Sequence, residues 1–528
     1  RRKRWGWGAE ARPPSLADLE AMAPLGRERL GFDAQAPEEP VPLARVELAA
    51  PRLAAPPALE PLCRSDPYER ASHALGKAYR DVVRGFRGEF EHVPDVVAHP
   101  RSESDIEALL AWCSAEGYAA IPYGGGTSVC GGVEPRLPRE YAGVVTVDLG
   151  ALDRVLEVDE VSRSALIEAG APGPALEDQL RERGLTMRCY PQSFELSTLG
   201  GWIATRAGGH FATRLTHVDD MVESVRAITP TGEWESRRLP GSGAGPSPDR
   251  MLIGSEGILG VITQAWVRVQ PRPTHRTSCA VAFDSFEDGA EAVRELAQSG
   301  LDPSNCRLVD AAEAAWSGAG AGERSLLMLG FESAHHPVDS DMSVALEAAR
   351  GHGGEPGPLR ASGPGTRSEG ERDASGAWRE AFLAAPYLRD SLIALGVLSE
   401  TFETATTWDR FPEVHASVLT AVREAVGQPA TVTCRFTHVY PDGPAPYFTV
   451  LAPARRGSEV AQWDDVKSAA SEALEAAGAT ITHHHAVGRD HRPWYDRQRP
   501  EAFAAALRAA KHAVDPAGVL NPGVLIDP

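Results

Sequence analysis

Residues 121–133 read IPYGGGTSVCGGV, the apolar end of a strand followed by a loop that contains five glycines. Because glycine has no Cβ, such a loop lets backbone N–H groups approach an anion closely. It lacks the Gly-Lys-Ser/Thr ending of a P-loop and the Gly-x-Gly-x-x-Gly spacing that opens a dinucleotide-binding helix. Taken alone, the loop is either an anion cradle or a tight turn, and its surroundings decide between them.

The segment before this loop predicts a β/α unit. Ser102 with Asp105 resembles a helix N-cap with an acidic first turn, and apolar residues follow at helical spacing up to Cys113. An extended entry segment, 94–100, precedes that helix, and a strand that ends at Ile121 follows it.

Two further loops of small residues lie downstream, at 193–209 and 253–263. Strands are expected at 144–149, 154–158 and 164–169 and a helix at 174–183 before the first of these loops, and a further strand is expected at 265–270 after the second. Three such loops in one half of the chain suggest a long ligand that lies across several strand ends.

The composition sets limits on the class of protein. At 528 residues with a formal net charge of −20, the chain is long enough for several domains and too acidic for an electrostatic grip on nucleic acid. Seven scattered cysteines without a Cys-x-x-Cys pair fit a reducing compartment, and we expect a cytoplasmic location. The basic start is followed by no apolar stretch typical of a secretory signal, and no run approaches the length of a membrane span.

The sequence pattern changes after residue 273, where the loops of small residues end, and we place a domain boundary there. Strands are expected at 326–331, 398–403 and 431–439, the last pairing with 447–451 as a hairpin, and a strand followed by a helix at 281–301. The region 351–376 is poor in apolar residues and predicts disorder or a mobile lid. Helices are expected at 464–477 and 501–514, with a strand at 479–485 between them.

That last strand carries three consecutive histidines, His483, His484 and His485. On a strand His483 and His485 would share one face, and His484 would point the other way. A metal site would need a third ligand and a supporting carboxylate, which no spaced motif supplies, so we expect no metal. The remaining interpretations are an active-site acid/base role, a contact with a cofactor, or a run of surface histidines without a function.

Two other residues have both a structural and a functional interpretation. Arg389 could form a surface ion pair with Asp390, or it could serve as a guanidinium fork for a carboxylate or phosphate. Tyr447 could be a core residue of its strand or a proton carrier, which would need a neighbouring cation or base.

Several of these motifs together resemble a known family. Segments 122–129, 192–198, 205–207 and 254–260 look like the flavin-binding half of the vanillyl-alcohol oxidase type of FAD proteins. The segments 403–410 and 434–435, Tyr447 and the stretch 483–488 are similar to the alkylglycerone-phosphate synthases, and this likeness covers nearly the whole chain.

The resemblance implies an α+β fold with four parts. These are an N-terminal extension packed on the surface (1–90), a two-subdomain FAD-binding domain (91–272), an α+β cap or substrate domain (273–455) and a C-terminal helical segment that returns to close the site (456–528). The cofactor would be FAD. Its expected contacts are Pro122, Gly124, Gly125, Gly126, Thr127, Ser128, Gln192, Ser193, Ser197, Thr198, Thr205, Arg206, Ala207, Gly254, Glu256, Gly257, Gly260 and Ile262.

The resemblance also implies a reaction without net oxidation. The acyl group of an acyl-dihydroxyacetone phosphate would be exchanged for a long-chain alcohol, giving an ether lipid precursor. Arg389 would hold the phosphate, with Arg307 as a further functional arginine of the cap. Tyr447 would move the C1 proton, and His483, His484 and His485 would line the catalytic pocket.

One position departs from the family. Cys189 stands where these synthases have an active-site histidine, and a thiol cannot give a cationic donor. The departure favours an alternative, an FAD-dependent dehydrogenase or oxidase of a 2-hydroxy acid or alcohol, because the same scaffold serves many oxidations. A catalytically silent flavoprotein is a third interpretation.

The expected partners follow from the leading interpretation. They are a lipid-like phosphorylated substrate, a long-chain alcohol and a second copy of the chain in a homodimer. Apolar substrates make peripheral membrane contact reasonable, although no lipidation motif requires it.

Overall fold

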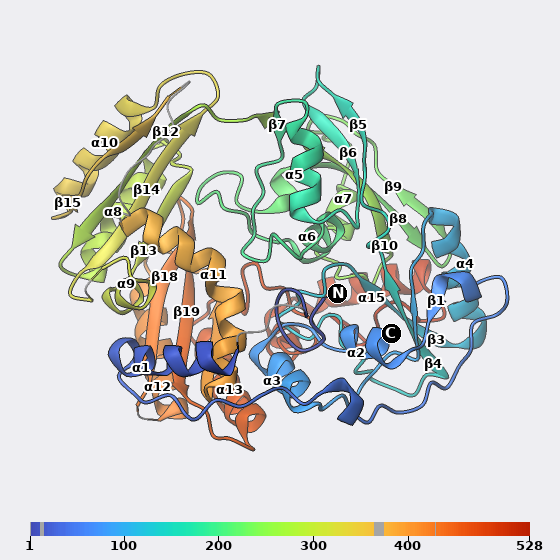
Figure 1. Ribbon diagram of the computed structural model, residues 1–528. Helices are drawn as coiled ribbons and strands as arrows, with labels where there is room; N and C mark the ends of the chain where they lie inside the picture. The colour runs from blue at the N-terminus through green and yellow to red at the C-terminus, as the bar shows by residue number, and fades with distance from the viewer. Residues whose placement is uncertain (1, 11–14, 321, 364–373, 428, 528) are drawn as a thin grey trace.

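The computed structural model describes residues 2–10, 15–320, 322–363, 374–427 and 429–527. The chain is organised as two halves that face one another (Figure 1). We call the half built on residues 63–271 and 492–527 the FAD-type half, after the cofactor expected there, and the half built on residues 275–476 the cap half. The fold is of the expected α+β class. None of the helices in the described residues combines the length and apolar composition that crossing a membrane requires.

The first sheet of the FAD-type half has the strand order β1-β2-β4-β3. β2, β4 and β3 run parallel, so their carboxyl ends lie at one edge, where the glycine loop begins. The expected capping box at Ser102 and Asp105 opens the helix between β2 and β3. The elements are β1 (Cys63–Arg64), β2 (Val96–Ala98), α4 (Glu103–Glu116), β3 (Tyr118–Tyr123) and β4 (Gly143–Asp148).

The second sheet is antiparallel, with the order β5-β6-β10-β8-β9. Its strands are β5 (Val155–Asp159), β6 (Ser164–Glu168), β8 (Val222–Thr229), β9 (Gly232–Glu235) and β10 (Val261–Arg268). Alongside lie α5 (Gly173–Arg181), β7 (Leu185–Thr186), α6 (Leu199–Thr205), α7 (Asp249–Leu252) and β11 (Gln270–Pro271). One apolar core joins the two sheets, α4, α5, α6 and the C-terminal residues.

The cap half is built on an eight-stranded sheet in the order β15-β12-β14-β13-β18-β19-β17, with β16 also paired to β12. The strands are β12 (His275–Phe283), β13 (Asn305–Val309), β14 (Ser325–Ser333), β15 (Glu355–Pro356), β16 (Arg360–Ser362), β17 (Val397–Glu403), β18 (Thr431–Val439) and β19 (Pro444–Pro453). The predicted hairpin of β18 and β19 is confirmed.

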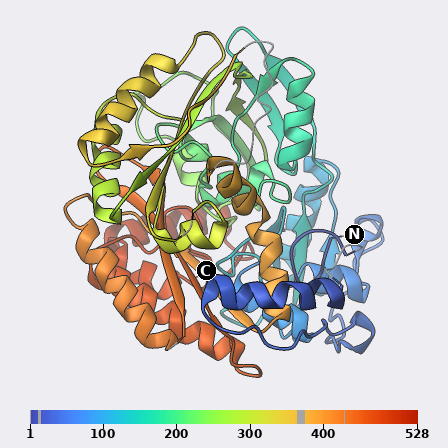
Figure 2. The same cartoon turned by 60° about the vertical axis from the view of Figure 1, so that its left-hand side comes forward.

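Helices cover both faces of this sheet (Figures 1 and 2). The larger core lies under α8 (Phe286–Gln298), α10 (Asp339–Gly351), α12 (Phe411–Val426) and α13 (Glu459–Ala476), and α1 (Leu16–Leu30) joins it through Leu19 and Leu30. The other face carries α9 (Ala311–Ser317) and α11 (Ala374–Ala394).

The C-terminal segment returns to the FAD-type half. After α14 (Arg492–Gln498) and α15 (Glu501–Val514), Asn521 and Val519 hydrogen-bond to Ala120 in β3. The end of the chain therefore supports the strand that carries the glycine loop.

Three expectations differ from the structure. Residues 479–485 form a loop and no strand, because a buried carboxylate takes the backbone N–H groups that a strand would need. Within 351–376, short strands β15 and β16 replace part of the predicted disorder, and residues 364–373 lie outside the described part. The N-terminal extension is not confined to the surface, since Lys3, Trp5 and Trp7 are buried and α2 (Pro67–Ser72) and α3 (Tyr79–Arg87) belong to the interior.

Candidate active site

A cavity between the two halves brings together the glycine loops, the cap strands and two of the three predicted histidines, His484 and His485. The third, His483, lies beside them but is not among the lining residues. One wall consists of the loops after β3 and before α6 together with α6 itself, and the opposite wall consists of α11 and the strands β17, β18 and β19. Alternate residues of β19, Tyr447, Thr449 and Leu451, face this space, as the two-residue period of a strand requires.

The first wall has the shape that a bound cofactor needs. A Cβ on Gly124 would stand 2.3 Å from Thr198 Oγ1, and one on Gly125 would stand 2.1 Å from the carbonyl oxygen of Leu196. Glycine is therefore required here for two loops to meet and leave their backbone at the cavity. Thr198 Oγ1 is buried without a hydrogen-bond partner in the described residues, which suits a polar group supplied by a ligand.

Most of the predicted FAD contacts line the cavity, and two do not. Arg206 is turned outward, where NH2 donates to Asp219 Oδ2 at 3.0 Å, and Gly254 packs behind it. Those that line the cavity are Pro122, Gly124, Gly125, Gly126, Thr127, Ser128, Gln192, Ser193, Ser197, Thr198, Thr205, Ala207, Glu256, Gly257, Gly260 and Ile262.

Glu256 connects this wall to the C-terminal loop. Its carboxylate accepts hydrogen bonds from the backbone N–H groups of Val487 at 2.9 Å and Gly488 at 2.8 Å. Burial raises the pKa of Glu256 to about 7, because the two N–H donors only partly compensate for the lost hydration.

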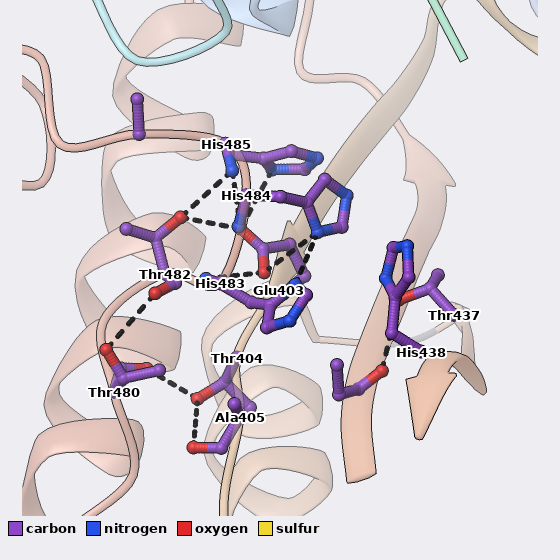
Figure 3. A network of polar contacts seen from close by, with 12 residues as sticks. Glu403, Thr404, Ala405, Thr437, His438, Thr480, Thr482, His483, His484 and His485 are labelled. Atoms are coloured by element: carbon purple, nitrogen blue, oxygen red, sulfur yellow. Dashed lines mark hydrogen bonds and ion pairs between the residues drawn. The ribbon is translucent and has the colours of Figure 1, made fainter. Parts of the chain in front are cut away.

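The histidine triplet is held by a second carboxylate, Glu403, at the end of β17 (Figure 3). The carboxylate accepts from the backbone N–H groups of His483 at 2.6 Å, His484 at 3.1 Å and His485 at 2.9 Å, and from Thr482 Oγ1 at 2.6 Å. These four donors bend the chain around one buried charge, which explains why the triplet is a loop.

Proton distribution around Glu403 follows from burial. Burial lowers the pKa of all three imidazoles, so they are neutral near pH 7. Burial also opposes ionisation of Glu403, yet its pKa is held below its usual range by the surrounding polar groups. The imidazoles of His484, His485 and His483 contribute most to this lowering, followed by the hydroxyl of Thr482.

A fourth histidine, His438 of β18, lies beside the triplet (Figure 3). Its ring centroid is 5.0 Å from that of His483, and its Nε2 bonds to the carbonyl oxygen of Gly209 at 3.1 Å. His438, His483 and His484 each bring one nitrogen within 4.8 Å of the others, an arrangement that could hold a metal ion. His438 thus supplies the third ligand that the sequence motif alone did not provide.

Strand alternation alone does not place His438 at the cavity. Regular alternation would put His438 on the face opposite Thr437, but the register between β18 and β19 shifts between Phe436 and His438. This bulge turns both Thr437 and His438 toward the cavity.

Tyr447 lies directly opposite Glu403 in the pairing of β17 with β19. The guanidinium carbon of Arg435 stands 3.8 Å above the Tyr447 ring, and the ring of His485 lies 5.4 Å away. Arg435 also pairs with the buried Glu313. Tyr447 therefore has both the cation and the imidazole neighbours that a proton-transferring phenol needs.

Arg389 and Arg307 both line the cavity. Arg389 does not pair with Asp390; it donates to the Lys77 carbonyl at 2.9 Å and to Thr401 Oγ1 at 3.1 Å. Arg307 donates to the His210 carbonyl at 2.9 Å, and burial beside Arg435 lowers its pKa to about 10.

Cys189 takes no part in the cavity wall. It is buried behind the wall, with Sγ 3.4 Å from the place of a Cβ on Gly209, and burial raises the pKa of its thiol to about 12. The thiol is therefore a packing group and does not exchange protons near pH 7.

Comparison with known proteins places this architecture in a class. Residues 94–236 match the model described as "FAD binding domain", and residues 272–525 match "FAD linked oxidases, C-terminal domain". The solved p-cresol methylhydroxylase has the same fold, with a TM-score of 0.70 at 15% identity over 89% of this chain and 94% of that one. The chain therefore contains an FAD-binding domain and a C-terminal domain of the FAD-linked oxidase type, and its cofactor is FAD.

The similarity to one group of enzymes extends over most of the chain. The chain is 29% identical to an alkyldihydroxyacetonephosphate synthase of Dictyostelium discoideum over 497 residues, covering 88% of this chain and 78% of the relative. A solved alkyldihydroxyacetonephosphate synthase superimposes with a TM-score of 0.80 at 24% identity, covering 99% of this chain and 98% of that one. The resemblance to this synthase family, expected from the sequence motifs, is confirmed.

Proposed function

We propose that this protein is an FAD-dependent, redox-neutral transferase that exchanges the acyl group of an acyl-dihydroxyacetone phosphate for a long-chain alcohol. The observation that carries the proposal is the placement of Tyr447 between the Arg435 guanidinium and the imidazole of His485, in a cavity that also presents Arg389. The name of the relatives supports the same substrates.

Bound FAD would supply an isoalloxazine ring that accepts and returns electron density, so the exchange needs no external oxidant. Segment 124–128 and Thr198 would hold it along the first wall.

Tyr447 would remove a proton from C1 of the substrate and later return it. The guanidinium of Arg435, whose charge is partly balanced by Glu313, would hold the ring of Tyr447 in place for this transfer. The C1–oxygen bond to the acyl group breaks, releasing a fatty acid, and the alcohol oxygen forms the new bond to C1. The neutral His484 and His485 could accept the alcohol proton.

Substrate binding would combine a polar and an apolar arm of the cavity. Arg389, with the hydroxyls of Ser399 and Thr401, would bind the phosphate. The apolar arm is suited to a long alkyl chain and is lined by Trp316, Phe382, Ala385, Leu388 and Leu392.

An anaerobic experiment separates transfer from oxidation. The purified protein is incubated without oxygen with acyl-dihydroxyacetone phosphate and a fatty alcohol, and ether product and flavin absorbance are followed. We expect ether with no lasting bleaching. Bleaching by a 2-hydroxy acid such as D-lactate, with no ether formed, would favour the oxidoreductase alternative.

We also propose that the enzyme contacts a membrane surface peripherally, because both substrates carry long apolar chains. The homodimer expected from the sequence is proposed as its assembly. Analytical ultracentrifugation and flotation with phosphatidylcholine vesicles test the two statements. A monomer in the first, or absence from the vesicle fraction in the second, would remove the corresponding statement.

A further inference from the structure

The first residues of the chain form a small buried hairpin, residues 2–9. Arg2 and Ala9 make an antiparallel bridge, and the Lys3 N–H donates to the Gly8 carbonyl at 2.9 Å. Within this hairpin Lys3, Arg4, Trp5 and Trp7 are buried. A segment that reads as a basic tail is therefore part of the interior.

Trp5 anchors this hairpin to α3, within the larger core of the cap half. Its ring meets Phe86 edge-on at 5.2 Å between centroids, and Gly85 of α3 leaves the room for it, since a Cβ there would stand 2.8 Å from the Trp5 Cα. Trp5 does not line the cavity.

The other side of the hairpin grips α11 through Asp390. The buried Asp390 carboxylate accepts from Lys3 Nζ at 2.7 Å and from the Trp7 backbone N–H at 3.0 Å. Gly6 is required at this contact, because a Cβ would stand 2.3 Å from the carboxylate. With Asp390 bonded to the hairpin, the charge of its neighbour Arg389 meets only the neutral acceptors Lys77 O and Thr401 Oγ1 in the described residues.

The Trp7 side chain lines the same cavity as Arg389 and leaves one polar group unused. The residue is only 5% exposed, and its Nε1 is buried without a hydrogen-bond acceptor among the described residues. A buried N–H without an acceptor is costly and rare in native proteins, so a ligand atom is the natural partner.

We propose that Trp7 is a substrate-binding residue whose Nε1–H donates a hydrogen bond to the phosphoryl group held by Arg389. The hairpin positions both groups, because Lys3 and Trp7 fix Asp390 next to Arg389. The inference rests on the proposed function, which supplies a phosphorylated substrate. A phosphoryl group fits better than an alkyl chain, since it offers acceptors to the indole N–H and negative charge to the Arg389 guanidinium, which forms no ion pair within the part of the chain that the structure describes.

The test compares Trp7→Phe with Trp5→Phe as the matched control, since both lose an indole from the same hairpin and only the first faces the cavity. Dihydroxyacetone phosphate is the probe in calorimetric titrations of the FAD-loaded protein. We expect Trp7→Phe to raise its Kd about tenfold with unchanged FAD content, while Trp5→Phe binds it like the wild type. Arg389→Ala should weaken binding as well, and the double variant should lose less than the product of the two single effects if both groups hold one phosphoryl.

Replacing Trp7 with β-(3-benzothienyl)alanine, which substitutes sulfur for the N–H in a ring of nearly the same shape, separates the hydrogen bond from packing. This variant should match Trp7→Phe in affinity. Wild-type affinity in both variants, loss of FAD in place of loss of affinity, or no binding of the probe to the wild type would overturn the inference. Ether formation by the wild type is scored separately: probe binding that depends on Trp7 without ether formation would sink the proposed function and leave this inference standing.

Discussion

Glu403 and Glu256 hold opposite ends of the same loop, and they differ in charge state. Glu403, from the cap half, has four donors around it, three of them backbone N–H groups of the histidines. Glu256, from the FAD-type half, has the N–H groups of Val487 and Gly488. The pKa of Glu403 is held below its usual range, whereas burial raises that of Glu256 to about 7. Both carboxylates are buried, and the three imidazoles and the Thr482 hydroxyl around Glu403 keep it ionised, whereas burial dominates at Glu256.

Because of this difference in charge state, the two ends of the loop have different roles. The end at Glu403 carries the imidazoles and lies opposite Tyr447 in the sheet, so it is fixed by a permanent charge. The end at Glu256 joins the loop to the cofactor wall and gains or loses its charge near neutral pH. Each of the following changes tests one side of this comparison.

The largest effect is expected for Tyr447→Phe, on the Glu403 side. Removing the phenol removes the proposed proton carrier, and turnover should fall at least about 10³-fold, within the range of general acid–base catalysis. Ether formation and the flavin spectrum are measured on the same sample. FAD content should equal that of the wild type; turnover within a few-fold of the wild type would exclude Tyr447 from the chemistry.

Glu403→Gln should come next, with kcat lowered about 10²-fold. The amide cannot accept from all four donors, so the histidines lose their fixed positions while Tyr447 remains. Glu400→Gln is the control, because this residue is buried on the same strand but binds Trp463 and Lys467 away from the loop. Equal losses of kcat in the two variants at equal stability would show that Glu403 has no special role in positioning.

Glu256→Gln should have a smaller effect, visible as a pH dependence of stability. Since folding raises the pKa of Glu256 from 4.5 to about 7, its contribution to stability is complete below pH 4.5 and is lost as pH rises through 7. A glutamine does not titrate, so the variant should gain on the wild type by at most about 3 kcal/mol between pH 4.5 and 8.

Thermal unfolding of both proteins at several pH values measures that difference. Glu403→Gln serves as the contrast, because the pKa of Glu403 lies below its usual range and its carboxylate does not titrate in this window. A difference between wild type and Glu256→Gln that stays constant with pH would contradict the raised pKa.

The smallest effect is expected for Cys189→Ala. The thiol is buried outside the cavity, so removing it should change kcat by less than about twofold and cost about 1 kcal/mol of stability through lost packing. Cys306→Ala, which also removes a buried thiol, is the reference for the packing loss. A much larger loss of kcat for Cys189→Ala would show that this position takes part in the reaction.

The FAD-type half was largely predictable from sequence because its signals are local. The N-cap at Ser102, the strand before the glycine loop and the loop itself each depend on neighbouring residues, and the structure confirms them, with the strand ending at Tyr123 instead of Ile121. Arg206 shows the limit of transferring a motif, since its side chain turns away to Asp219.

The other side of the cavity depends on contacts that no local pattern encodes. Glu403 and the histidine triplet are about 80 residues apart, and the carboxylate converts an apparent strand into a loop. His438 faces the cavity because of a bulge in β18. Trp7 lies at the cavity in a hairpin that is bound to Asp390, more than 380 residues away in the sequence. The domain boundaries at 90, 272 and 455 and the roles of the individual site residues stay predictions.

The central claim, an exchange at C1 without net oxidation, is tested most directly by the fate of the alcohol oxygen. The wild-type enzyme is given acyl-dihydroxyacetone phosphate and an ¹⁸O-labelled fatty alcohol without oxygen, and the products are analysed by mass spectrometry. The account predicts that the ether carries the label and that the released fatty acid does not. An unlabelled ether, or oxidised alcohol in place of ether, would contradict it.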